Sequence, residues 1–280
     1  MITIRLNGGL GNQMFQYATA KALASHNDIQ LALDVNEFDT YDLRDLEIDK
    51  YNIKSKIINQ NYFIKKAIKK LRLSTIFNSY YIEKSLQYDE NIKCVADNLY
   101  LEGYFQNEKY FIDIRSELLR DFSIKGKVSN YCKEIDGLIC NSLNSVSIHV
   151  RRGDYVTNQQ ANEMHGTCSV EYYEQAMSFM DDKLGSSNYF IFSDDINWVK
   201  NNLNIENAVY IENNNRTPHE DIYLMSRCSH NIIANSSFSW WGAWLNNYNN
   251  KHVVYPHAWF TNEKNNIIIM ASMPNNWTRI

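Results

Sequence analysis

The second half of the chain alternates short apolar runs with segments in which apolar residues recur at helical spacing. The apolar runs predict strands at residues 145–150, 188–192, 208–211, 230–235 and 252–255. The segments between them predict helices that begin near residue 169, include residues 198–199, and cover residues 220–228 and 240–245. This alternation predicts a parallel sheet with helices on both faces.

The first half follows the same order less regularly. Residues 2–6, 29–35 and 99–107 predict strands, and residues 14–25 and 110–120 predict helices. The chain becomes polar near residues 125–130, so we expect a domain boundary there or shortly after it. The pattern therefore predicts two α/β domains, residues 1–135 and residues 136–280.

Composition is that of an ordinary soluble protein. The chain has 280 residues, 44% of them hydrophobic, and its formal net charge of -4 gives no general attraction to nucleic acid. Its five cysteines form no Cys-x-x-Cys pair, which favours reduced thiols. The sequence shows no secretory signal and no membrane-spanning stretch, so we expect a cytoplasmic protein.

Residues 62–72 are the one strongly biased segment. Helical spacing places apolar residues on one stripe, while four lysines and Arg72 take most of the remaining positions. Such a helix can lie on an anionic membrane surface, which would give a peripheral contact with the inner membrane. A solvated helix face on a globular domain is the alternative.

Polar clusters end three of the strands predicted in the second half. They are residues 151–154, which contain Arg151, Arg152 and Asp154, residues 193–195, and residues 235–237. Because the carboxyl ends of parallel strands lie at one edge of a sheet, we expect the three clusters to share a rim. Guanidinium groups match phosphate geometry, and the third cluster opens a helix whose first N–H groups favour phosphate.

This rim predicts a pyrophosphate site. An ion pair with Asp154 and an N-cap at Ser236 are the purely structural alternatives, but the ion pair accounts for only one of the two arginines. The sequence has no Asp-x-Asp motif to hold a metal, so the arginines would neutralise the diphosphate themselves.

A glycine-rich turn at residues 7–13 follows the first predicted strand. It is not a dinucleotide fingerprint, because Met14 stands where the third glycine would be, and no Gly-Lys-Ser/Thr ending makes it a Walker loop. Backbone N–H groups and two side-chain amides suit contact with an anion or a sugar. A purely structural turn fits these residues equally well.

Three blocks of sequence resemble the motifs of bacterial α-1,2-fucosyltransferases, glycosyltransferase family 11. They are GGLGNQMFQYA at residues 8–18, HVRRGDY at residues 149–155 and NSSFSWWGAWL at residues 235–245. The resemblance covers most of the chain, and the second block is similar to a motif shared with α-1,6 and protein O-fucosyltransferases. It implies a GT-B-like α/β fold, in which two Rossmann-like domains face each other across a cleft.

The resemblance also implies roles for individual residues. Arg151 would hold the diphosphate of GDP-β-L-fucose and stabilise its developing charge, while Arg152 and Asp154 would order the loop. The other implied donor-side residues are His149 beside the guanine, Asp221 accepting from guanine N–H groups, and Asn235, Ser236, Ser237 and Phe238 along the phosphates. Gly9 and Asn12 would approach from the N-terminal, acceptor-side domain.

The general base stays open at this point. Inversion by direct displacement needs a carboxylate or histidine near the acceptor hydroxyl. The α-1,6 relatives have a glutamate where this chain has Gln159, which leaves Glu163, His165 and Asp154 as candidates. A loose, oxocarbenium-like displacement assisted by phosphate is a further route.

The resemblance implies a metal-independent α-1,2-fucosyltransferase without a cofactor. Its acceptor would be a galactose-terminated oligosaccharide, lipid-linked if the enzyme works in O-antigen or surface-polysaccharide synthesis. A transferase that uses another GDP-sugar or makes another linkage is the alternative within enzymes. A non-catalytic glycan-binding protein that uses Trp240, Trp241 and Trp244 is the alternative outside them, although their helical spacing predicts core positions.

Overall fold

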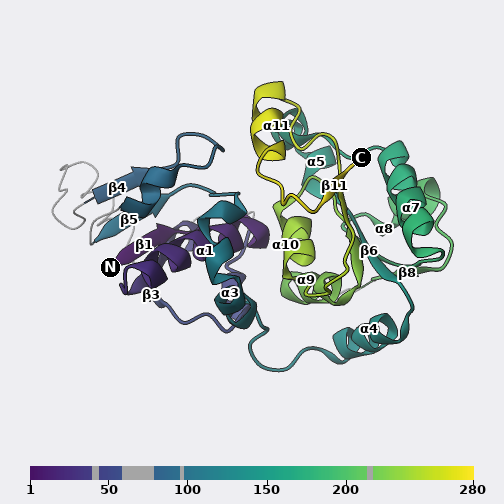
Figure 1. Ribbon diagram of the computed structural model, residues 1–280, viewed down its shortest axis with the longest axis horizontal. Coiled ribbons are helices and arrows are strands. Elements are labelled where there is room, and N and C mark those ends of the chain that lie inside the picture. Colours follow the sequence, from purple (N-terminus) through teal and green to yellow (C-terminus); the bar gives the residue numbers. More distant parts are fainter. Residues whose placement is uncertain (40–43, 59–78, 95–97, 213–216) are drawn as a thin grey trace. The chain divides into compact units, whose positions relative to one another are not determined.

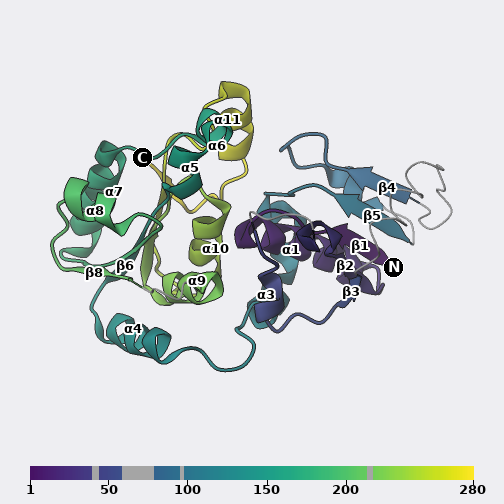
Figure 2. The same cartoon turned by 180° about the vertical axis from the view of Figure 1, so that it is seen from behind.

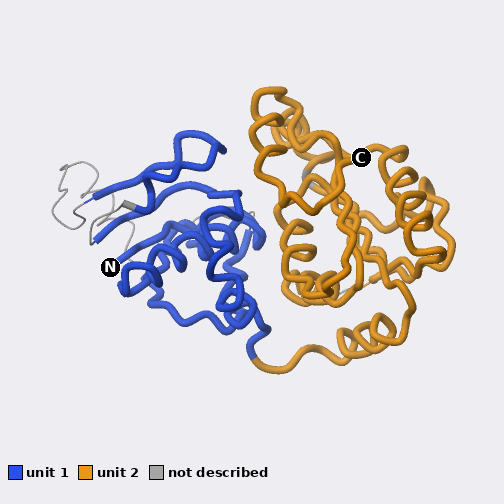
Figure 3. Tube along the Cα trace, in the orientation of Figure 1, with its two compact units in different colours: residues 1–125 blue, residues 126–280 orange. Residues whose placement is uncertain are grey.

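The chain forms two compact units, residues Met1–Lys125 and Gly126–Ile280 (Figure 3). The computed structural model describes residues 1–39, 44–58, 79–94, 98–212 and 217–280. The boundary expected after residue 135 lies inside helix α4 (Asn130–Asn141), which belongs to unit 2. Gly126, the first residue of unit 2, has a φ of 87°, a left-handed conformation that glycine adopts without steric cost.

Unit 1 is built on a five-stranded parallel sheet with the order β3-β2-β1-β5-β4 (Figure 1). Its strands are β1 (Ile2–Arg5), β2 (Leu31–Asp34), β3 (Lys56–Ile58), β4 (Ser79–Ile82) and β5 (Leu99–Glu102). The central strands β1, β2 and β5 are almost entirely buried, whereas the edge strands β3 and β4 carry exposed side chains.

Helix α1 (Leu10–His26) starts four positions earlier than the apolar spacing predicts. Gly9 is its extended N-cap, with φ -74° and ψ 170°, so the rest of the glycine-rich turn forms the first helical turn. The predicted helix at residues 110–120 divides into short pieces. Unit 1 also contains η1 (Asn36–Asp39), η2 (Ile48–Lys50), η3 (Glu90–Cys94), η4 (Glu108–Tyr110), η5 (Ile112–Ile114) and α3 (Arg115–Asp121).

Unit 2 is built on a six-stranded sheet with the order β11-β10-β9-β6-β7-β8. Its strands are parallel, as the sequence pattern predicts, whereas the edge strand β11 lies outside the five predicted strands. Its strands are β6 (Ser145–Val150), β7 (Asn188–Ser193), β8 (Ala208–Tyr210), β9 (His230–Ile232), β10 (Val253–Tyr255) and β11 (Thr278–Arg279). All six residues of β6 are buried, and the strand lies between β7 and β9. The arginine pair therefore follows a central strand of the sheet.

Helices cover both faces of this sheet (Figures 1 and 2). Helices α7 (Val170–Leu184) and α8 (Ile196–Asn202) pack on one face, and α9 (Pro218–Arg227) and α10 (Ser237–Leu245) on the other. Trp240, Trp241 and Trp244 of α10 are core residues, with exposed fractions of 3%, 0% and 3%. The remaining helices are α5 (Gly153–Thr157), α6 (Gln159–His165) and α11 (Glu263–Met270).

The basic segment at residues 62–72 lies outside the described residues. Within the described ranges, every helix is too short or too polar to cross a lipid bilayer.

Candidate active site

The rim of unit 2 at the carboxyl ends of its strands brings the predicted clusters together. Val150 at the end of β6 pairs with Ser193 at the end of β7, so Arg151 and Asp194 follow neighbouring strands at the same level. Arg151 Nη1 lies 2.8 Å from Asp194 Oδ2, and Asp194 Oδ1 accepts the backbone N–H of Arg152 at 2.8 Å. One carboxylate thus orients the first arginine and fixes the backbone of the second.

Gly153 allows this arrangement. A Cβ atom at residue 153 would lie 2.4 Å from Asp194 Oδ2 and 3.0 Å from its Cγ, well inside van der Waals contact. Asp194 is held by both the Arg151 side chain and the Arg152 backbone, so moving it away would break these contacts. The glycine of the HVRRGDY block therefore lets the arginine loop approach Asp194 closely.

Arg152 is held differently. Its guanidinium carbon lies 4.0 Å from the centre of the Trp198 ring, and its Nε lies 3.7 Å from Asp195 Oδ2. Trp198 stands in the first turn of α8, whose N-cap is Asp195. A guanidinium stacked on an indole keeps its in-plane N–H groups directed sideways, where an anion can reach them.

We expect Trp198→Leu to weaken binding of GDP about fivefold, because a cation–π contact contributes about 1 kcal/mol at a partly exposed position. Trp198→Phe keeps an aromatic face and should retain most of the affinity. Isothermal titration calorimetry with GDP would measure both. Equal losses of GDP affinity in the two variants would show that the volume of the Trp198 side chain, not its aromatic face, holds Arg152.

The N-terminus of α10 lies on the same rim. Ser236 is 7% exposed and accepts the backbone N–H of Phe238 at 3.3 Å, so it is the N-cap of the helix. The ring of Phe238 lies 5.4 Å from that of His149, which is 5% exposed at the end of β6. Ser237 and Phe238 are half-buried, so the first turn of α10, with the positive end of the helix dipole, lies partly exposed near the arginine loop.

Asn235 holds the rim together from inside. It is 2% exposed, and its side-chain amide donates to the backbone oxygens of His165, Gly166 and Trp259 at 2.9, 3.3 and 3.3 Å. Its Oδ1 accepts from the Cys168 thiol at 3.5 Å, and burial raises the pKa of that thiol to about 11, so the thiol remains a donor. These contacts anchor the loop after α6 to the end of β9.

Stacked rings extend from Arg151 along the rim. The guanidinium of Arg151 lies 5.6 Å from the centre of the Tyr155 ring. The Tyr155 ring is parallel to that of His165, with centroids 4.7 Å apart and an angle of 3°, and His165 in turn lies 5.1 Å from Phe260. Tyr155 also donates to the backbone oxygen of Asn235 at 3.3 Å, which ties the stack to the rim.

The two described candidates for a general base have different surroundings. His165 is half-buried in the stack, whereas Glu163 is exposed and accepts from Gln159 Nε2 at 2.8 Å. The third candidate, Asp154, has a side chain that lies outside the described part of the structure. Of the two candidates with described side chains, His165 is the one whose ring packs on the rim.

Asp221 lies in the first turn of α9 and is half-buried. Its neighbour Glu220, which the sequence does not single out, is 4% exposed and accepts from the backbone and hydroxyl of Ser129 at 2.5 and 2.8 Å and from Thr217 at 2.7 Å. Burial raises the pKa of Glu220, but the hydrogen bonds from Ser129 and Thr217 outweigh it, and the pKa is lowered overall. Glu220 therefore stays ionised and fastens the start of α4 to the start of α9.

The glycine-rich turn of unit 1 combines a structural amide with an accessible one. Gln13 is 0% exposed. Its side-chain amide forms hydrogen bonds inside the unit with backbone groups of Gly8, Asp45, Glu47 and Ile48. Asn12 is half-buried, and its Oδ1 accepts from Gln106 at 2.8 Å. Arg44 comes within 3.7 Å of a Cβ built at Gly9, which places a cation beside the turn.

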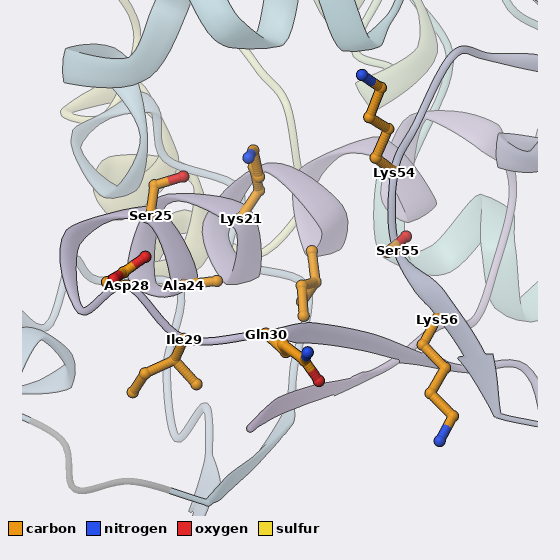
Figure 4. A pocket seen from close by; sticks show the side chains of 10 residues that line it. Lys21, Ala24, Ser25, Asp28, Ile29, Gln30, Lys54, Ser55 and Lys56 are labelled. Carbon is orange, nitrogen blue, oxygen red and sulfur yellow. The ribbon is translucent and has the colours of Figure 1, made fainter.

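Unit 1 also has a broad hollow of about 650 Å³ at the opposite, amino end of its sheet (Figure 4). Its lining includes Lys21, Lys54 and Lys56. The three ammonium groups point in different directions (Figure 4). Lys21 forms an ion pair with Glu117 at 3.3 Å. The hollow lies away from the motif residues, which all follow carboxyl ends of strands.

Among the described residues, no three His, Cys, Asp or Glu side chains gather closely enough to hold a metal ion. The charge on the rim of unit 2 is instead organised by two arginines and the two aspartates that follow β7.

Comparison with known proteins gives this arrangement a family. The model of Glycosyl transferase family 11 matches residues 1–280. The chain belongs to glycosyl transferase family 11. The family identified from the three sequence blocks is therefore confirmed, and the protein is a glycosyltransferase.

Two relatives from Escherichia coli match this family 11 chain over nearly its whole length. It is 35% identical over 294 residues to an α-1,2-colitosyltransferase, covering 100% of this chain and 99% of that protein. It is 33% identical over 297 residues to the O-antigen biosynthesis glycosyltransferase WbnK, covering 96% of this chain and 98% of WbnK.

The fucosyltransferase NodZ from Bradyrhizobium has a similar structure. It matches with a TM-score of 0.53 at 11% sequence identity, covering 86% of this family 11 chain and 92% of NodZ. At this identity the likeness concerns the fold alone. Together with the two parallel-sheet α/β units, it confirms the expected GT-B-like fold class.

Proposed function

We propose that this family 11 protein is an inverting α-1,2-fucosyltransferase. It would move L-fucose from GDP-β-L-fucose to the 2-hydroxyl of a terminal galactoside, in the synthesis of O-antigen or another surface polysaccharide. The α-1,2 linkage and the pathway are supported by the names of the two Escherichia coli relatives, and fucose is supported by the motif resemblance. Unit 2 would hold the donor and unit 1 the acceptor.

The observation that carries the proposal is the pair of arginines on the rim of unit 2. Arg151 and Arg152 follow one buried strand. The Arg151 side chain forms an ion pair with Asp194, and the Arg152 side chain stacks on the Trp198 ring. The N-terminus of α10 adds the positive end of its helix dipole on the same rim. This combination matches a diphosphate, which needs several donors and a positive field.

The mechanism follows from where charge develops. As the bond between fucose and diphosphate breaks, negative charge grows on the diphosphate oxygens. A guanidinium has five N–H donors, so the contact of Arg151 with Asp194 orients the group and leaves other donors for the phosphate. Because these donors are fixed before the reaction, they stabilise the leaving group without reorganising, and no metal ion is required.

The acceptor hydroxyl must lose a proton during the displacement. We assign this role to His165, because the stack of Tyr155 and Phe260 fixes its ring on the rim, whereas Glu163 is exposed and its carboxylate accepts from Gln159. A neutral imidazole accepts a proton near neutral pH. Asn235 would support His165 by holding its backbone oxygen.

Colitose is a second candidate for the transferred sugar, favoured by the 35% identity with the α-1,2-colitosyltransferase. Colitose lacks the 3-hydroxyl that fucose carries. Parallel assays with GDP-fucose and GDP-colitose would separate the two, because a site that hydrogen-bonds this hydroxyl strongly rejects the sugar without it.

The first test of the donor site is calorimetric titration with GDP and with UDP in the presence of EDTA. We expect GDP to bind in the micromolar range regardless of EDTA, and UDP to bind at least tenfold more weakly. Equal binding of both nucleotides would remove guanine selectivity from the proposal. Loss of GDP binding in EDTA would instead show that a metal ion takes part.

A further inference from the structure

Unit 1 has a second, smaller hollow of about 220 Å³ along strand β4 and the loop that follows it. Both Tyr80 and Tyr81 line it, and consecutive residues of a strand point to opposite faces of the sheet. The hollow therefore lies along the outer edge of β4. Within the described ranges β4 pairs with β5 alone.

Tyr80 is the exposed wall of this hollow, with 55% of its surface accessible. One face of its ring stacks on Tyr100, with centroids 5.0 Å apart and an angle of 11°. Its hydroxyl donates to Glu102 Oε2 at 2.5 Å, and the other oxygen of Glu102 lies 2.5 Å from Arg5. Tyr80 thus presents a flat ring that is already locked in place.

The loop after β4 is equally well fixed. Tyr81 donates to Asp89 Oδ2 at 2.8 Å, and Asp89 Oδ1 accepts the backbone N–H of Asn91 at 3.0 Å. The backbone N–H of Gln87 donates to Ser85 Oγ at 3.3 Å, while the Gln87 side chain lines the hollow. The hollow is therefore a rigid aromatic and polar cradle, which costs little entropy to fill.

We propose that this hollow binds one pyranose ring of the acceptor saccharide, an assignment that rests on the proposed glycosyltransferase activity. A pyranose has a face of C–H groups, which suits the Tyr80 ring, and a rim of hydroxyls, which suits the polar lining residues Ser85 and Gln87. The hollow also lies toward the carboxyl end of the sheet in unit 1, the end that carries the glycine-rich turn and Asn12.

A saccharide fits these observations better than a protein partner. A peptide strand added to β4 would need more than the four residues of Ser79–Ile82 to gain a useful ladder, and a stable interface with another protein buries about 800 Å² on each side. A hollow of about 220 Å³, lined by residues of one short strand and the loop after it, accommodates a single ring.

The test compares Tyr80→Ala with two matched variants. Tyr80→Phe keeps the ring and loses only the hydroxyl, and Tyr248→Ala removes a tyrosine of similar exposure, 50%, from unit 2. Saturation-transfer NMR with lactose measures saccharide binding directly, and initial rates with GDP-fucose give the KM for lactose. We expect Tyr80→Ala to lose the lactose signal and to raise this KM at least tenfold. The KM for GDP-fucose should stay within twofold in every variant.

Contrary outcomes are clear. Gln87→Ala serves as a second variant if Tyr80→Ala unfolds, and an unchanged lactose KM in whichever variant is folded would overturn the assignment. If the wild type binds lactose and Tyr80→Ala does not, the saccharide site is supported even when the wild type is inactive with GDP-fucose. The proposed function can therefore fail while the proposed saccharide site stands. A wild-type dimer that Tyr80→Ala converts to a monomer in sedimentation velocity, without lactose binding, would make β4 an interface between copies instead.

Discussion

Arg151→Ala should lower kcat/KM for GDP-fucose about 1000-fold, because it removes a fixed donor from the place where charge develops in the transition state. Arg151→Lys should recover part of the loss, since lysine restores the charge but not the planar fork. Steady-state kinetics with a galactoside acceptor measures both variants, and calorimetry with GDP separates ground-state binding from catalysis.

The matched control for this experiment is Arg227→Ala. Arg227 forms an ion pair of 2.7 Å with Asp136, similar in length to the 2.8 Å pair of Arg151 and Asp194, but it lies on the opposite end of α9 from Asp221. We expect the kcat/KM of Arg227→Ala to match that of the wild type. A folded Arg151→Ala protein that keeps activity within tenfold of the wild type would contradict the diphosphate role.

Gln13→Ala should lower the free energy of unfolding of unit 1 by about 3 kcal/mol, since each buried group left without its partner costs roughly 1 kcal/mol or more. The Gln13 amide donates to the backbone oxygens of Gly8 and Asp45 and accepts from the backbone N–H groups of Glu47 and Ile48, at distances from 2.9 to 3.1 Å. Urea unfolding followed by circular dichroism measures the change.

Gln30→Ala provides the control, because Gln30 is exposed and its loss should change the free energy of unfolding by less than about 0.5 kcal/mol. A Gln13→Ala protein as stable as the wild type but with a raised KM for the acceptor would reverse our interpretation. The side chain would then be a sugar ligand and not a structural amide.

The hydrophobic periodicity of the sequence was enough to predict which residues lie on the rim of unit 2, because in a parallel sheet the residues that follow the strands lie at one edge. Once residues 145–150, 188–192 and 230–235 are strands of one parallel sheet, their following residues must share an edge. The observed register of β6 with β7 and β9 follows this logic. Edge strands such as β3 and β4 have no buried alternation to reveal them, since their exposed positions carry isoleucine, lysine and tyrosine.

The partners of polar side chains were not predictable in the same way. Gln13 is bonded to groups 32 to 35 positions away, and Asn235 to groups 24 to 70 positions away. A sequence gives the residue type but not the loop that will meet it, so a buried structural amide and a ligand-binding amide look alike. Trp198 was missed for the same reason, because its aromatic face matters only once Arg152 lies above it.

The contact between Arg152 and Trp198 also gives the protein an intrinsic optical reporter. The chain has six tryptophans, and Trp240, Trp241, Trp244, Trp259 and Trp277 are all buried, none more than 8% exposed. Trp198 alone is half-buried beside a cation of the candidate nucleotide site. A change in indole emission when a nucleotide is added, present in the wild type and absent in Trp198→Phe, would therefore report on this position without any label.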